Sequence, residues 1–337
     1  MYSNCRANWP ARRPDLAVYT QLGPEDVAPL LARYDAGDLV SLKGIAEGVQ
    51  NSNFFVETTK SRFILTLYEE RVDPVDLPFF YALLKHLHEA GCKVPRFIAD
   101  KEGRWLQEVA GRPACLIEFL QGVSVTKPTT AQARSTAAAL GQMHAALADF
   151  TESRANSLGL QDWRPLARLC TETGLDDIQN GLARRIFAEC DYLESHWPSH
   201  LPVAAIHADL FPDNVLMLGD RVTGLIDFYF ACTDIRGYDL AVTHTAWCFE
   251  SGSFDPAVSE AILAGYRATF TLDVPTRDAM PVLLRGACLR FLLTRCYDWI
   301  NTPANALVTR KDPLAFLRRL DFYSDDDNVA LILGHLG

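Results

Sequence analysis

The sequence predicts an α+β fold of two lobes, in which a small antiparallel β-sheet with one helix precedes a larger, mainly helical lobe. Three observations support this prediction. The 337 residues exceed what one ordinary hydrophobic core contains. Short apolar runs separated by polar turns, a pattern typical of strands, occupy the chain from residue 40 to residue 119. Beyond residue 120, apolar residues recur at helical spacing over long segments.

The first lobe is predicted to contain a sheet and a single helix. The helix begins at Pro78, a residue suited to the first helical position, and continues to Ala90, where Gly91 ends it. Strands are expected at residues 40–43, 53–58, 63–69, 105–109 and 113–119.

The second lobe is predicted to be mainly helical. Thr129 and Gln132 form a capping box at the start of a long helix that continues to Phe150. Asp255 before Pro256 is another strong helix start signal. Further helices are expected at residues 163–170, 182–197, 238–249, 256–270 and 279–300.

The chain is expected to divide into an extension and two lobes. Residues 1–16 combine Asn, Arg and Pro without periodicity, so we expect a disordered extension. The hinge between the lobes is expected at residues 118–122. Residues 17–119 would then form the N-terminal lobe and residues 120–337 the C-terminal lobe.

Composition indicates a soluble globular protein, with 49% hydrophobic and 22% charged residues. No apolar run approaches the roughly 20 residues of a membrane helix, and the N-terminus lacks the apolar core of a secretory signal. The net charge of −10 disfavours nucleic-acid binding, which needs a basic patch. The nine cysteines are odd in number and form no C-x-x-C pair, which disfavours a disulfide framework and a zinc site. The expected location is the cytoplasm.

The strongest functional signal lies in one loop and the hairpin after it. His207, Asp209 and Asn214 form the pattern H-x-D-x-x-x-x-N, and Asp227 ends the apolar run that follows the turn at Gly219-Asp220. Phosphoryl transfer requires Mg²⁺ on the phosphate oxygens and a carboxylate that accepts the proton of the attacking hydroxyl. The loop Asp, the loop Asn and the later Asp meet both needs, so the pattern predicts a phosphotransferase site.

Together with Gly237-Tyr238-Asp239-Leu240-Ala241, this loop resembles the aminoglycoside phosphotransferase and choline kinase superfamily, relatives of protein kinases. Further segments resemble the bacterial homoserine kinases of the kinase-like type; these are residues 43–54, residues 65–69 leading into 76–80, and Tyr297-Asp298-Trp299. The likeness extends from about residue 17 to the C-terminus. It implies a two-lobed protein-kinase-like fold, the cofactors ATP and Mg²⁺, and phosphorylation of the small molecule L-homoserine in threonine biosynthesis.

The resemblance also implies roles for individual residues. Asp209 is expected to be the catalytic base, and Asn214 and Asp227 are expected to bind Mg²⁺. The N-terminal lobe is expected to bind the nucleotide, with phosphates near the first turn and adenine at the hinge. The predicted nucleotide contacts are Gly44, Gly48, Ser52, Asn53, Glu118, Phe119 and Leu120.

Three further polar residues are expected to have structural roles. His207 is expected to orient the catalytic loop through hydrogen bonds. Asp239 would cap a helix or tie the loop backbone in place. His144 lies on an apolar helix face and is expected to pack in the core.

One position departs from the kinase pattern. The third strand normally presents a lysine to the phosphates, but Thr66 stands there, and residues 78–88, which would supply its glutamate partner, contain no carboxylate. The absence of both the lysine and the glutamate makes physical sense, because either charge alone would be poorly compensated in the cleft. Phosphate binding would then depend on Mg²⁺, backbone N–H groups and another base such as Lys43 or Arg71. The alternative is a kinase-like binding module without catalysis.

The substrate pocket is expected in the helical lobe, beside the catalytic carboxylate. An amino acid needs a base for its carboxylate and an acceptor for its ammonium group. Arg290, Arg295, Tyr297 and Asp298 lie on one predicted helix, and Arg295 is the base favoured for the carboxylate. Arg295 and Asp298 project to the same side of that helix, although an ordinary surface ion pair would look the same. Choline, an amino sugar and an aminoglycoside remain alternatives, and Trp247, Trp299 and Tyr229 would suit a choline cage. The sequence does not predict the oligomeric state.

Overall fold

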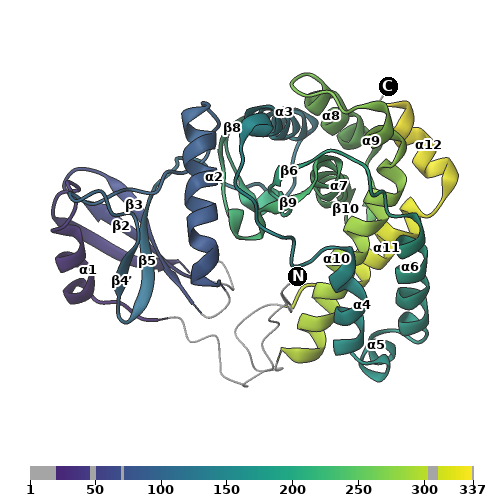
Figure 1. Cartoon of the computed structure of the whole chain (residues 1–337), viewed down its shortest axis with the longest axis horizontal. Coiled ribbons are helices and arrows are strands. Elements are labelled where there is room, and N and C mark those ends of the chain that lie inside the picture. Colours follow the sequence, from purple (N-terminus) through teal and green to yellow (C-terminus); the bar gives the residue numbers. More distant parts are fainter. Residues whose placement is uncertain (1–19, 46–50, 70–71, 303–309, 336–337) are drawn as a thin grey trace.

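Both expected lobes are present in the computed structural model, which describes residues 20–45, 51–69, 72–302 and 310–335. Figure 1 shows a small lobe built on a sheet beside a larger helical lobe, with helix α2 (Leu77–Glu89) between them. The predicted extension at residues 1–16 lies outside the described residues. The α+β, two-lobed prediction is therefore confirmed.

The small lobe contains a five-stranded antiparallel sheet in the order β1-β2-β3-β5-β4. The register pairs Thr66 with Asn53 on one side and with Cys115 on the other, so Thr66 lies in the middle of the sheet. The strands are β1 (Leu39–Ile45), β2 (Asn51–Thr58), β3 (Arg62–Tyr68), β4 (Gln107–Val109) and β5 (Arg112–Glu118).

Both faces of this sheet are covered. Because successive side chains of a strand point to opposite faces, Ala114 and Leu116 pack with helix α1 (Pro24–Leu31), while Cys115 and Ile117 pack with α2 and the large lobe. The sequence prediction of one helix in this lobe missed α1. This helix has only 8 residues and contains Pro29, so its periodic signal is short.

The large lobe begins with α3 (Thr130–Ala146), whose predicted capping box is present. Thr129 Oγ1 accepts a hydrogen bond from Gln132 N–H at 3.2 Å, and Gln132 Oε1 accepts one from Thr129 N–H at 2.9 Å. The helix ends before the predicted Phe150, because Leu147–Asp149 form a 3₁₀ turn. It packs closely on α8 (Pro256–Arg267), where a Cβ atom at Gly265 would lie 2.2 Å from the Arg134 carbonyl oxygen.

Several helices of this lobe pack around α10 (Met280–Asn301), which contacts α4, α6, α7 and α11. Helix α10 is apolar on most of its circumference, as expected for a central helix. The short helices α5, α9, α11 and α12 were not predicted, because a few residues carry little periodicity. The bounds are α4 (Leu160–Leu169), α5 (Glu172–Ile178), α6 (Leu182–His196), α7 (Arg236–Trp247), α9 (Val274–Asp278), α11 (Leu314–Tyr323) and α12 (Asp326–Gly334).

Short antiparallel ladders link these helices. The predicted hairpin is present as β7 (Val215–Leu218) and β8 (Arg221–Leu225), joined through Gly219 with φ of 61°. The apolar run at residues 201–206, which predicts a strand before the loop with the H-x-D-x-x-x-x-N pattern, contains β6 (Val203–Ile206), and its partner β9 (Cys232–Ile235) was not predicted. A further ladder joins β10 (Phe249–Glu250) to β11 (Ser253–Phe254). Among the described residues, no helix has the length and apolarity needed to cross a bilayer.

Candidate active site

The loop that carries the H-x-D-x-x-x-x-N pattern, residues 207–214 (the motif loop), begins where β6 ends. The hairpin β7–β8 then brings the chain back to this loop. Ala208 and Asp227, one on each side of this meeting point, both have φ of 63°, in the left-handed region that residues with a Cβ atom rarely adopt. Such conformations cost about 1 to 3 kcal/mol each and persist only where surrounding contacts impose them. The backbone here is therefore held by its neighbours.

Asp239 on α7 supplies part of that restraint. Its carboxylate accepts hydrogen bonds from the backbone N–H groups of His207 and Ala208, both at 2.8 Å. His144 Nε2 lies 3.0 Å from the same carboxylate. Burial alone would raise the pKa of Asp239, but the hydrogen bond from His144 and the loop N–H groups outweigh it and lower the pKa. Asp239 therefore ties the loop, as expected, and the buried His144 supports it.

His207 connects the loop to the hairpin. Its Nδ1 accepts a hydrogen bond from Asp209 N–H at 3.2 Å, and its Nε2 lies 3.0 Å from the Ile226 carbonyl oxygen. Nδ1 is an acceptor here, so Nε2 carries the proton and donates to that carbonyl. Burial lowers the pKa of His207, which keeps the ring neutral. The orienting role expected for His207 agrees with these contacts.

Asp209, Asn214 and Asp227 are brought together. Asn214 Nδ2 donates to the Asp209 carbonyl oxygen at 2.7 Å and to its carboxylate at 3.1 Å. The backbone carbonyl oxygen of Asn214 accepts a hydrogen bond from the N–H of Ile226, the residue before Asp227, at 3.0 Å, and the charge of Asp227 acts on Asp209. The three side chains predicted from the motif therefore converge, and their catalytic and metal-binding roles stay predictions.

The electrostatics of this cluster suit a cation. Burial raises the pKa of Asp209 to about 7, a nearby Arg290 opposes the rise, and the negative charge of Asp227 adds to it. Asp227 is exposed, yet desolvation by the surrounding protein, together with the charge of Asp213, raises its pKa to about 6. Carboxylates that disfavour each other's charge are stabilised by a divalent cation bound between them.

Arg290 is one of two candidate pocket arginines on the predicted helix, and it is the one not selected there for a role. It lies on α10 and is only 3% exposed, with its Nη2 atom 3.9 Å from Asp209 Oδ1. Its Nη1 donates a hydrogen bond to the Ala208 carbonyl oxygen. The available signal was an arginine inside the apolar run from Leu289 to Leu293, because a charge at such a position needs a buried partner.

The predicted phosphate contacts lie on β1 and β2 or outside the described residues. Gly44 is exposed on β1, opposite Phe54, whereas Gly48 and Arg71 fall outside the described residues. Ser52 is buried and donates to Glu69 at 2.7 Å. Asn53 Oδ1 accepts from the Thr66 hydroxyl at 2.7 Å. These side chains have partners inside the lobe, and their contact with phosphate stays a prediction.

The predicted adenine contacts form the connection between the lobes. Glu118 pairs with Arg96 at 3.0 Å at the end of β5. Phe119 meets the ring of Phe55 edge-on, with ring centroids 5.4 Å apart. The side chain of Leu120 lies over Gly224 in β8, where an added Cβ atom would be 2.7 Å from Leu120 Cδ1. The hinge segment therefore touches both lobes, and adenine binding there stays a prediction.

Aromatic rings occupy the junction where kinases usually have the lysine–glutamate pair. Thr66 is buried in β3, and α2 presents Phe80 toward the large lobe. Tyr229, two residues after Asp227, meets Tyr68 and Phe80 edge-on, with ring centroids 5.7 Å apart in both pairs. Packing of this kind can replace a buried ion pair without loss of stability.

Arg295 is the first of the predicted substrate residues. Arg295 donates to the Asp312 carbonyl oxygen at 3.1 Å and lies over the Phe316 ring at 4.5 Å. Burial and the charge of Arg319 lower the pKa of Arg295 to about 10, while Asp312, Asp213 and Asp209 oppose the change. Arg295 therefore stays cationic at neutral pH and lies within electrostatic range of Asp209.

The other two predicted substrate residues lie further along α10. Asp298 is exposed and lies near Cys170 at the end of α4. The pKa of Cys170 is raised mainly by the burial of its thiol and further by the charge of Asp298. The Tyr297 carbonyl oxygen accepts a hydrogen bond from Asn301 at 2.8 Å. Substrate binding by both residues stays a prediction.

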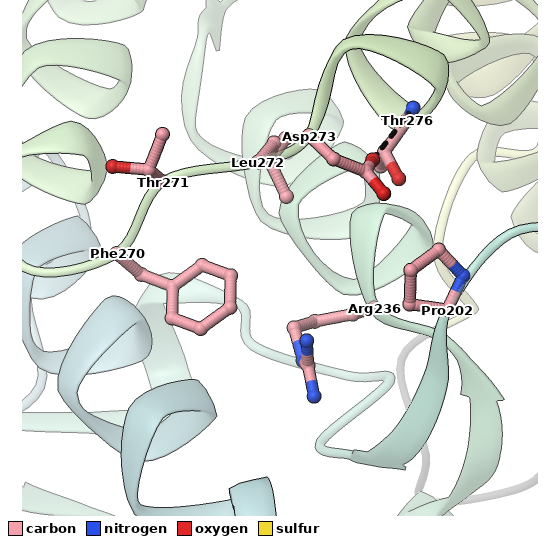
Figure 2. Close-up of a pocket in the computed structure, with 7 residues that line it drawn as sticks. All are labelled: Pro202, Arg236, Phe270, Thr271, Leu272, Asp273 and Thr276. Carbon is pink, nitrogen blue, oxygen red and sulfur yellow. Dashed lines mark hydrogen bonds between the residues drawn. The ribbon is translucent and has the colours of Figure 1, made fainter.

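A separate hollow lies at the other end of β6 from the catalytic loop. Figure 2 shows Arg236 extended beside the ring of Phe270, at 4.9 Å from the guanidinium to the ring centroid, and Asp273 accepting a hydrogen bond from Thr276 N–H. Its lining comprises Pro202, Arg236, Phe270, Thr271, Leu272, Asp273 and Thr276. None of the predicted site residues lines it, so the candidate active site is defined by the motif loop.

Comparison with known proteins shows the family and the fold of this chain. Residues 41–280 match the phosphotransferase enzyme family, APH. The amicoumacin kinase hAmiN in complex with AMP-PNP, Ca²⁺ and Ami has a TM-score of 0.67 at 15% identity, covering 90% of this chain and 94% of that one. Spectinomycin phosphotransferase APH(9)-Ia, in complex with ADP and spectinomycin, has a TM-score of 0.64 at 14% identity, covering 92% and 98%. The chain belongs to the phosphotransferase enzyme family and has its kinase-like fold.

Relatives with higher sequence identity indicate which members of that family this chain resembles. The homoserine kinase of Zymomonas mobilis subsp. mobilis is 49% identical over 312 residues, which are 92% of this chain and 98% of the relative. The homoserine kinase of Sinorhizobium fredii is 50% identical over 309 residues, 91% of this chain and 94% of the relative. The resemblance to homoserine kinases inferred from the motifs is therefore confirmed over most of the chain.

Proposed function

We propose that this protein is a homoserine kinase, which transfers the γ-phosphoryl group of ATP to the side-chain hydroxyl of L-homoserine and yields ADP and O-phospho-L-homoserine. The observation that carries the proposal is the identity of about half, over more than nine-tenths of this chain, with proteins named homoserine kinase. The complete motif loop supports catalysis over the binding-module alternative, although Thr66 replaces the usual lysine.

The chemistry follows from the loop. Asp209 accepts the proton of the substrate hydroxyl as the hydroxyl oxygen attacks the γ-phosphorus. The bond from that phosphorus to the oxygen bridging the β- and γ-phosphates breaks, and ADP leaves with the electron pair. Asn214 and His207 fix Asp209 through the hydrogen bonds described above, which keep its carboxylate directed at the hydroxyl.

Asn214 and Asp227 would hold Mg²⁺. The Asn214 amide nitrogen donates to Asp209, so its side-chain oxygen is left as the ligand atom, and Asp227 would supply a carboxylate. The raised pKa of both Asp209 and Asp227 fits a site made for a cation. When bound, Mg²⁺ neutralises charge on the phosphate oxygens.

Arg295 is the proposed partner of the homoserine carboxylate. Its charge lies within range of Asp209, which is where the substrate hydroxyl must be. Arg295→Ala should raise KM for homoserine by about tenfold or more and leave KM for ATP nearly unchanged, because a charged hydrogen bond is worth about 1.5 to 3 kcal/mol. Arg318→Ala is the matched control, since Arg318 pairs with the same Asp312 at 3.0 Å but is half exposed. Equal KM changes in the two variants would remove Arg295 from the pocket.

A coupled ADP-release assay tests substrate identity. Homoserine offers a primary hydroxyl and a carboxylate, choline lacks the carboxylate, and threonine has a secondary hydroxyl one carbon closer. A site built for paired polar groups rejects an analogue that lacks one by up to about 10⁴-fold. We expect kcat/KM to rank homoserine far above choline and an aminoglycoside, and clearly above threonine. Preference for choline or the aminoglycoside would discard homoserine as the substrate and keep the kinase assignment.

The product would place the reaction in threonine biosynthesis. We propose a cytoplasmic location, because the reaction consumes ATP and the cysteines of the described residues are all free thiols, as is usual in a reducing compartment.

A further inference from the structure

We infer that Arg290 is a positioning residue for phosphoryl transfer: from α10 it holds the Ala208 carbonyl group and the Asp209 carboxylate in the orientation that presents Asp209 to the substrate hydroxyl. The assay that tests this inference rests on the proposed function. The physical argument comes from the contacts of the buried guanidinium group.

The catalytic peptide is held from two sides. Asp239 on α7 accepts hydrogen bonds from the N–H groups of His207 and Ala208. Arg290 on α10 donates a hydrogen bond to the carbonyl oxygen of Ala208. Ala208 is buried and has φ of 63°. If Arg290 were removed, that carbonyl would lose its charged donor inside the protein, and the left-handed backbone could relax. Asp209 is the next residue, so its side chain would move with the peptide.

The guanidinium group suits this task better than an ammonium group. One Nη atom donates to the carbonyl oxygen while the other lies 3.9 Å from Asp209 Oδ1. At that distance the charge attracts the carboxylate without occupying it as a close hydrogen bond, which leaves the oxygen available for the hydroxyl proton. The rings of Phe291 and Phe230, with centroids 4.4 and 5.1 Å from the guanidinium carbon, fix the fork in place.

Helix α10 then links two parts of the site. Arg295 lies just over one turn beyond Arg290 on the same helix and is within electrostatic range of Asp209. A rigid helix that carries both arginines fixes the distance between the proposed carboxylate site and the catalytic carboxylate. That distance decides whether the substrate hydroxyl reaches Asp209, because misplacement by about 1 Å can cost about 10²-fold in rate.

The test compares Arg290 with Arg285, another arginine of α10 that is largely buried. Arg285 makes two hydrogen bonds to Glu189, at 2.8 and 2.9 Å, away from the loop. Met and Lys variants of each are purified, and kcat, both KM values and the thermal midpoint are measured. We expect Arg290→Met to lower kcat by about 10²-fold with both KM values nearly unchanged. Arg290→Lys should recover part of the loss, because an ammonium group can serve only one of the two acceptors at a time.

Arg285→Met should lower the thermal midpoint at least as much as Arg290→Met and keep kcat within about twofold, because it breaks an ion pair that does not touch the loop. Near-wild-type kcat in Arg290→Met would overturn the inference, and so would equal kcat losses at both positions. If Arg290→Met does not fold, the two Lys variants give the same comparison. If the wild type prefers another hydroxyl substrate, the proposed function fails, and the comparison is repeated on that substrate.

Discussion

At the scale of single residues, the proposed role of Asp209 as catalytic base can be tested separately from that of its neighbours in the loop. Asp209→Asn keeps the shape and the contact with Asn214 but removes the proton acceptor, so kcat should fall by about 10² to 10⁴-fold with little change in Mg·ATP affinity. Asp213→Asn is the matched control, because its side chain is 62% exposed and pairs only loosely with Lys311 at 3.5 Å. Steady-state kinetics with a nucleotide-binding titration checks both. Near-full turnover in Asp209→Asn would refute its assignment as the base.

The proposed metal ligands are also tested one by one. Asp227 contributes a charge and Asn214 a neutral oxygen, so Asp227→Ala should abolish turnover and weaken Mg·ATP binding, whereas high Mg²⁺ should partly rescue Asn214→Ala. The measurement is a Mg²⁺ titration of activity and of nucleotide binding in the three proteins. Identical metal dependence in the wild type and both variants would end the assignment.

At the scale of elements, the connection between the lobes is docked on the hairpin β7–β8. Val123 and Met217 exchange backbone hydrogen bonds at 3.0 and 2.9 Å. Gly122 has φ of 148°, and a Cβ atom there would lie 2.4 Å from Thr223 Oγ1 and 3.0 Å from the Met217 nitrogen. Only glycine fits this conformation and this approach.

Gly122→Ala should therefore displace the connection and move the predicted adenine contacts just before it. We expect a loss of about 1 to 3 kcal/mol in the free energy of unfolding and a higher KM for ATP. Gly103→Ala is the control, because Gly103 also has positive φ but has nothing within 4 Å of an added Cβ atom. Urea unfolding and ATP kinetics distinguish the two; an unchanged KM for ATP in Gly122→Ala would separate the connection from nucleotide binding.

At the scale of the whole molecule, buried histidine makes stability depend on pH. His244 is buried on α7, with Nδ1 2.8 Å from the Tyr323 hydroxyl and Nε2 2.8 Å from the Ser259 hydroxyl. Burial lowers its pKa from the ordinary 6.5 to about 3. Between these values the unfolded chain binds a proton that the folded chain does not. The contribution of His244 is thus present above the unfolded pKa and is lost as pH falls below it, by about 1.4 kcal/mol per pH unit.

His244→Gln should flatten this dependence. Asp209 and Asp227, whose pKa values are raised in the fold, act with the opposite sign, so only the difference between wild type and variant isolates His244. Urea unfolding at about pH 7.5, 6.5 and 5.5 measures it. Parallel stability curves for the two proteins would contradict the buried, neutral state of His244.

Features that depend on local signals could be predicted from the residues alone. The capping box at Thr129 starts α3, and the turn at Gly219 joins β7 to β8. Asp209 and Asn214, whose spacing defines the motif, are directly hydrogen-bonded. Each of these depends on residues a few positions apart, where residue type and periodicity dictate geometry. The motif therefore predicted which side chains converge, and the resemblance predicted the family.

The identity of the distant residues that hold the site in shape depends on how the chain packs. Ala208 and Arg290 are 82 positions apart, and His144 and Asp239 are 95 apart. The aromatic junction at Tyr229 likewise joins residues of both lobes. No local pattern specifies such contacts, because they depend on how helices pack around a shared core. A single buried charge in an apolar helix indicates that a partner exists, and only the packing of α10 against the catalytic loop identifies it.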